Sequence, residues 1–338
     1  MRTVPAQDAF SRLTDRLPDV GARVIRWLLV INLICQTVIA VTGSVVRVTG
    51  SGLGCDTWPN CHPGTLVPVA HPELDAITQW IEFGNRLLSV GIGLVALLCV
   101  LAVLGHRPRR TRLARLTIVT LGGTLLQGLI GGITVLMDLR WWTVAVHLLV
   151  SMSLVWTAML ALRASGEGDR EPRPLVPAPI RQLVATANGV LGALLVAGTL
   201  VTAAGPHAGD AATPRLNLPI DVLAQLHAEL LFLFLGLLIA LSFAFRAVSA
   251  PPRVWRGYWW LLGVVVAQGA IGMVQYWTGV PEVLVTLHVL GAALVVVAAA
   301  WLWTTLRDRG SVPTAFDPTK TNAIADSAGR RGEFASSK

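Results

Sequence analysis

Residues 125–136 read LLQGLIGGITVL, and residues 266–277 read VAQGAIGMVQYW. Each stretch is followed by another apolar one with a histidine close to its start, WWTVAVHLL at 141–149 and EVLVTLHVL at 282–290. The separation between Gln127 and Gln268 is the same as that between His147 and His288. One constant offset across two apolar segments indicates an internal duplication.

The apolar composition of the chain indicates that it is embedded in a membrane. Of the 338 residues, 54% are hydrophobic and 14% are charged, whereas ordinary soluble domains carry roughly 25% charged residues. A transmembrane helix needs about 20 mainly apolar residues. We therefore predict an all-α integral membrane protein with no room for a soluble domain. Its eight spans lie near residues 24–47, 79–104, 113–137, 141–163, 181–204, 220–246, 254–278 and 281–306.

The duplication predicts that the eight helices form two pseudo-symmetric four-helix bundles. Gly43 and Gly50 recur as Gly198 and Gly205, and both pairs have one common offset. Because an even number of helices separates the halves, both enter the membrane in the same sense. The predicted organisation is an N-terminal tail (1–23), an N-terminal half (24–163), a solvated linker with little fixed structure (164–180), a C-terminal half (181–306) and a disordered tail (307–338).

Lysine and arginine fall mainly on one side of the predicted spans. Both tails and the second, fourth and sixth connections hold most of them, while the opposite loops hold only Arg47, Arg140 and Arg215. Short basic loops stay cytoplasmic, so both termini and the linker are expected in the cytoplasm. The net charge of +8 then reflects membrane orientation, and no nucleic-acid partner is expected.

Polar side chains gather at one depth of the predicted bundle. His147, His227 and His288 each lie about two turns into a helix that begins on the outer side, which is roughly 10 Å below the membrane boundary. Glu82, Asn85 and Arg86 occupy the corresponding depth of the second helix. Ionisable residues inside a span are expensive and usually functional.

The three histidines are candidate haem ligands. Imidazole binds haem iron well, and facing histidines in a four-helix bundle are a common way to hold a cofactor. His227 and His288 provide two axial ligands in the second half, an arrangement that suits electron transfer. His147 has only Asn85 opposite it, so a haem there would have one replaceable side, as a bound substrate needs. Zinc or copper is an alternative, but neither half gathers the four ligands that zinc normally recruits.

Glu82 and Arg86 are open to two interpretations. They are four residues apart on one helix face, so they can form an internal ion pair that neutralises both charges. Alternatively, Glu82 accepts a proton beside the substrate and Arg86 meets a haem propionate or a developing negative charge.

The first outer loop contains Cys55 and Cys61, six residues apart on the oxidising side. A disulfide is compatible with that compartment, and free thiols are the alternative. The outer-loop histidines His62, His71 and His207 are expected to be solvated, without a metal role.

These motifs together resemble the heme A synthase family. They are TGSVVRVTGSGLGC at 42–55, the cysteine pair, an EFxxR run at 82–86, and the histidines near the starts of helices four, six and eight. The resemblance covers about residues 24–306.

The resemblance implies an oxidoreductase of a bacterial-type cell membrane that oxidises a ring methyl of haem O to a formyl group, giving haem A for cytochrome oxidase. His227 and His288 would ligate a permanent haem b that relays electrons. Haem O would lie near His147, with Glu82 as the carboxylate of the reaction site. Cys55 and Cys61 resemble the family's outer-loop disulfide. Membrane lipid, a haem O synthase and an electron acceptor such as quinone are the implied partners.

One residue departs from the family pattern, because Asn85 stands where the family's Glu-x-x-His-Arg motif has histidine. Ligation of haem by two histidines in the first half is therefore not expected. A non-enzymatic b-type cytochrome would explain the histidines equally well, but not Glu82 and Arg86. A transporter is a second alternative, since duplicated bundles are frequent in that class.

Overall fold

The computed structural model describes residue 14 and residues 16–312, and helices dominate this part of the chain. Eight of them are long and apolar enough to cross a membrane, which confirms the predicted all-α membrane fold and the number of spans. They are α2 (Ala22–Val48), α3 (Ala76–Gly105), α4 (Thr111–Leu136), α5 (Trp141–Ser165), α6 (Ala178–Ala204), α7 (Ile220–Ala247), α8 (Pro252–Trp277) and α9 (Glu282–Thr305).

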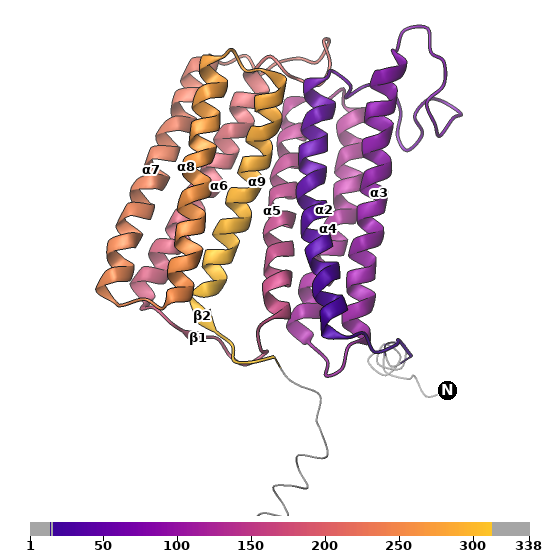
Figure 1. Cartoon of the computed structure of the whole chain (residues 1–338). Helices are drawn as coiled ribbons and strands as arrows, with labels where there is room; N and C mark the ends of the chain where they lie inside the picture. Colours follow the sequence, from indigo (N-terminus) through magenta and orange to yellow (C-terminus); the bar gives the residue numbers. More distant parts are fainter. Residues whose placement is uncertain (1–13, 15, 313–338) are drawn as a thin grey trace, which may run out of the picture.

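The helices lie in two groups (Figure 1). Helices α2–α5, the first half, pack in ring order, and helices α6–α9, the second half, do the same. The halves meet where α2 and α5 pack against α9 and where α5 packs against α6. Small and apolar side chains fill this junction, including Ala40, Val155 and Ala293. We call the end of the bundle that carries the 49–75 loop the loop end, and the opposite end the linker end.

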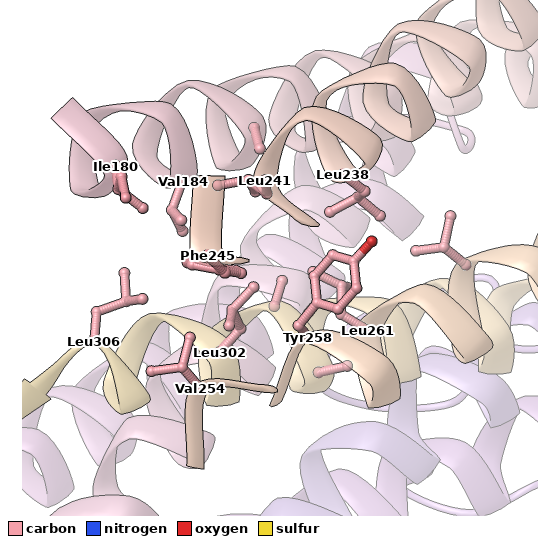
Figure 2. Packing of buried hydrophobic residues seen from close by; sticks show 14 of the residues in the cluster. Ile180, Val184, Leu238, Leu241, Phe245, Val254, Tyr258, Leu261, Leu302 and Leu306 are labelled. Carbon is pink, nitrogen blue, oxygen red and sulfur yellow. The ribbon is translucent and has the colours of Figure 1, made fainter. Parts of the chain in front are cut away.

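The core of the second half is built from aliphatic and aromatic side chains on all four helices. Figure 2 shows part of this cluster, in which Leu238 and Phe245 of α7 pack with Tyr258 and Leu261 of α8. These four side chains are at most 2% exposed. Since lipid is as apolar as leucine, such dense packing is what holds membrane helices together.

The residue offsets between the duplicated motifs also relate the ends of corresponding helices in the two halves. The offset that relates Gln127 to Gln268 takes both ends of α4 onto the ends of α8. The offset that relates Gly43 to Gly198 takes both ends of α2 to within one residue of the ends of α6. The last residues of α3 and α7, Gly105 and Ala247, are as many residues apart in the sequence as Asn85 and His227 are. Asn85 is thus the positional counterpart of His227.

Two predicted irregular segments are partly ordered. Strand β1 (Arg173–Pro174) in the linker pairs antiparallel with strand β2 (Arg307–Asp308), and the Leu175 N–H donates to the Leu306 carbonyl. The prediction of little fixed structure was therefore wrong at 173–174, and that of disorder was wrong at 307–308. Backbone pairing, which a polar composition does not reveal, orders them. The predictions for 1–13 and 313–338 lie outside the described residues.

Candidate functional site

His227 and His288 face each other inside the second half. Their rings lie 6.3 Å apart between centroids, with planes inclined by 56°. His227 is in the second turn of α7 and His288 is in the second turn of α9, so the two are level although they come from different helices. The structure thus brings together the two side chains predicted to share one haem.

Each of these rings rests against a glycine of a neighbouring helix. A Cβ atom built on Gly198 of α6 would lie 3.1 Å from Cε1 of His227, and one on Gly272 of α8 would lie 2.9 Å from Cε1 of His288. In both cases the ring's Cε1–Nδ1 edge faces the glycine backbone. The absence of a side chain at these glycines therefore makes room for the imidazoles.

The donor set of the second half fits a haem iron. The Nδ1–H group of His227 donates to the Leu194 carbonyl (3.1 Å), which leaves Nε2 free to ligate. Two imidazoles bound to opposite sides of one metal ion through bonds of about 2 Å have ring centroids about 6 Å apart. The observed 6.3 Å matches this spacing. Nδ1 of His288 is buried without a hydrogen-bond partner among the described residues.

We predict that Gly272→Ala weakens retention of the haem expected in the second half roughly tenfold to a hundredfold, because overpacking a tight contact costs about 1–3 kcal/mol. The added methyl group would collide with the His288 ring and push it from its position. The measurement is the haem content and low-spin spectrum of the purified variant. Gly236→Ala on α7, where no heavy atom lies within 4 Å of the new Cβ, is the matched control. Wild-type haem content in Gly272→Ala would contradict the glycine's role.

The first half holds one imidazole in the same way. A Cβ on Gly131 of α4 would lie 3.3 Å from Cε1 of His147 on α5. Gln127 donates through Nε2 to the His147 carbonyl (2.8 Å), and Gln268 donates to the His288 carbonyl at the same distance. Nδ1 of His147 is also buried without a partner in the described part of the chain. This ring is therefore held like His288.

Asn85 stands where His227 stands in the second half, but its side chain is held by a different contact. Its Oδ1 accepts a hydrogen bond from Thr42 of α2 (2.7 Å), next to Gly43. Gly43 is the counterpart of Gly198 in the duplication, but no heavy atom lies within 4 Å of a Cβ built there. No hydrogen bond between Asn85 and His147 is recorded among the described residues. The first half therefore has one imidazole and open space where the second half has two rings.

Glu82 and Arg86 bind each other and the outer loop. Glu82 Oε1 accepts from Arg86 Nη2 (2.5 Å) and Nε (3.1 Å), and its Oε2 accepts from the Cys55 N–H (2.7 Å). Arg86 also donates to the carbonyls of Cys55, Thr57 and Asn60. The internal ion pair foreseen from the i, i+4 spacing is formed, and it also fastens the loop to α3.

The fastened loop contains a disulfide between Cys55 and Cys61, whose Cα atoms are 4.4 Å apart. Both cysteines are fully buried. Trp58, inside the loop, lies against Gly132 of α4, where a Cβ would overlap its indole ring. Because Gly132 is adjacent to Gly131, the loop reaches the helix that carries the backing glycine of His147.

The solvated environment predicted for His62 was wrong, because its side chain is 4% exposed. Nδ1 lies 2.9 Å from Asp56 Oδ1, and Nε2 lies 2.9 Å from Gln79 Oε1. The ring stacks on His71 at 5.2 Å. Ligand atoms of Asp56, His62 and His71 lie within 4.8 Å of one another. A protonated His62 donates to both oxygen acceptors, and only the neutral ring keeps a lone pair for a metal ion.

The hydrogen bond to Gln79, followed by that to Asp56, raises the pKa of His62 above its ordinary 6.5, while burial opposes the shift. Because the pKa is higher in the folded loop, this side chain contributes its full stability below pH 6.5 and loses that contribution as pH rises through the raised value. We predict that reduction of the Cys55–Cys61 disulfide by a phosphine becomes faster above that pH, relative to an unfolded peptide of the same loop. His62→Gln should flatten this dependence, and His71→Ala should keep it. An unchanged dependence in His62→Gln would refute the prediction.

Sequence reasoning missed the partners of the histidines. The duplicated motif contains Gly131, Gly272, Gln127 and Gln268, but sequence reasoning did not link the glycines to the imidazole rings. The signal was available, because each of the two glycines precedes its histidine by the same interval. Gly198, by contrast, had no fixed spacing that linked it to His227.

Comparisons with known proteins identify the family to which the chain is similar. The model of the cytochrome oxidase assembly protein family matches residues 26–217. The heme A synthases of Staphylococcus aureus strains JH9 and Newman are each 30% identical to this chain over 167 residues, which is 48% of this chain and 54% of each relative. The match thus spans about half the length of these curated relatives.

Proposed function

This chain belongs to the cytochrome oxidase assembly protein family, the family of heme A synthase, and on that premise we propose that it oxidises a ring methyl of haem O to a formyl group to give haem A. The observation that carries the proposal is the pair of imidazoles 6.3 Å apart in the second half, beside a first half with one imidazole. One half is equipped to hold a permanent haem, and the other to exchange one.

In the second half, His227 and His288 would hold haem b, which supplies one-electron transfer when bound. The chain's own contribution is positioning. The Leu194 carbonyl fixes the tautomer of His227, and Gly198 and Gly272 leave space only for an imidazole edge. A ligand pair held this firmly changes little between oxidation states, which suits a relay.

In the first half, His147 would bind the haem O substrate on one side. Asn85 is held by Thr42 and offers an amide where a second imidazole would stand. The weaker set of ligands allows the product to leave. Glu82, 4% exposed, would hold or accept a proton at Oε1 or Oε2, and Arg86 would keep it in place. Trp58 and the fastened loop would limit the entry of water from the loop end.

We further propose that both termini lie in the cytoplasm, since the basic residues flank the linker end of the bundle. A haem O synthase as the source of substrate and a quinone as electron acceptor complete the proposed partners.

The test is to express the chain with a source of haem O, extract the haems, and record the optical spectrum of the purified protein. Haem A together with a low-spin haem b spectrum is the expected result. Haem b without haem A would favour a non-enzymatic b-type cytochrome. A preparation without a Soret band would refute both haem functions and favour a transporter.

A further inference from the structure

Two buried amides in α2 have unused hydrogen-bonding groups. Asn32 is 2% exposed, and its Oδ1 has no partner among the described residues. Gln36, one turn further along the same face, is 3% exposed and donates through Nε2 to Thr124 Oγ1 of α4 (2.8 Å). Its side-chain oxygen accepts no recorded hydrogen bond from the described residues. Unpaired amides are costly inside a membrane bundle, so these groups indicate a ligand with polar hydrogens.

Asn32, Gln36, Thr120 and Thr124 form what we call the polar seam. Helices α2 and α4 both run from the linker end to the loop end (Figure 1). Because Asn32 and Thr120 each lie four residues before the bonded pair Gln36 and Thr124, they share one level, about 6 Å closer to the linker end. Beyond them an apolar cluster that includes Ile25, Leu29 and Leu113 closes the bundle.

The second half has no such seam in the part of the chain that the structure describes. The offset from Gly43 to Gly198 takes Asn32 and Gln36 to Ala187 and Leu191, and the offset from Gln127 to Gln268 takes Thr120 and Thr124 to Leu261 and Val265. All four counterparts are buried at 5% exposure or less and belong to the apolar core, where Figure 2 shows Leu261. The polar groups are therefore not a requirement of this bundle geometry, since an apolar set fills the same positions in the other half.

The seam lies beneath the candidate substrate position. Gln36 is about 18 Å from the loop end of α2, and His147 is about 9 Å from the loop end of α5, at 1.5 Å per residue. Gly43 is two turns above Gln36 on the same face, and no heavy atom lies within 4 Å of a Cβ built there. A molecule bound at the level of His147 would thus find open space on the way to the seam.

We propose that the polar seam recognises the hydroxyl group of haem O, which haem b lacks, a step that rests on the proposed function. Haem O carries this hydroxyl at the base of a long apolar side chain. Asn32 and Gln36 present amide oxygens one helical turn apart that can accept the hydrogen of this hydroxyl. A site that hydrogen-bonds a substrate hydroxyl discriminates strongly against the analogue without it, because its own polar groups are then left unpaired.

The experiment measures binding rather than turnover. Purified full-length protein that already holds haem in its second half is titrated with haem O and, separately, with haem b, and the Soret change gives both dissociation constants. We expect wild type to bind haem O at least tenfold more tightly. Asn32→Ala and Gln36→Leu, which install the residues of the second half, should each weaken haem O binding roughly threefold to tenfold, leave haem b binding unchanged, and leave the haem of the second half bound.

Ser153→Ala is the matched control, because Ser153 lies at a similar depth on the exposed face of α5 and should leave the ratio unchanged. Equal binding of the two haems by wild type would overturn the proposal. An undiminished preference in both seam variants would overturn it as well. If neither haem binds to the first half, the proposed function itself fails, and this result is distinguishable from a loss of preference alone.

Discussion

Replacing His288 by alanine is expected to remove the haem b proposed for the second half almost completely. The ring supplies one of two imidazoles that face each other at 6.3 Å, and no other described side chain takes its place on α9. A haem left with His227 alone would have one axial ligand, so its low-spin spectrum should disappear. The measurement is the haem stoichiometry and reduced-minus-oxidised spectrum of the purified variant.

His147→Ala is the matched variant in the other half, because its ring rests on Gly131 as His288 rests on Gly272. It should retain haem b largely intact while haem A formation falls below detection. If His147→Ala instead loses haem b and His288→Ala keeps it, the assignments of the two halves must be exchanged.

Glu82→Gln is expected to lower haem A formation at least a hundredfold, since a positioned proton acceptor typically contributes about 10²–10⁴-fold. Haem b should remain bound, because the hydrogen bonds of Glu82 in the described structure join it to Arg86 and the outer loop and not to the second half. The readouts are haem chromatography and the haem b spectrum. Glu229→Gln, on the exposed face of α7, is the control for the same chemical change.

The Arg86→Met variant tests the hydrogen bonds that hold the outer loop separately from proton transfer by Glu82. It leaves the carboxylate in place but removes the donors to the Cys55, Thr57 and Asn60 carbonyls, and breaking a buried ion pair costs about 3–5 kcal/mol. The disulfide should then be reduced much faster. If Glu82→Gln exposes the disulfide as strongly as Arg86→Met does, Glu82 acts through the loop, and its role as proton acceptor is contradicted.

The helices were predictable because a membrane span has a simple physical signature. About 20 apolar residues suffice to identify one, and the helix ends of the structure fall within a few residues of the predicted spans. The common depth of His227 and His288 was predictable as well, because the rise per residue of a helix is fixed and the residues can be counted from each helix start.

Contacts between segments were not predictable in this way. The burial of His62 depends on where the 49–75 loop folds back onto α3, and no periodic pattern encodes that position. The hydrogen bonds from Arg86 to the loop carbonyls depend on the same fold. The strands β1 and β2 contain two residues each, too few for an alternating pattern to show.

The pairing of β1 with β2 also imposes an order on synthesis of the chain. Strand β1 precedes α6, whereas β2 follows α9, so β1 leaves the ribosome long before its partner exists. The strand pair at the linker end of the second half can therefore form only after the last helix has been made. A ribosome that stopped before Leu306 would release a chain with all eight long helices complete, but with the Leu175 N–H and strand β1 still without a partner.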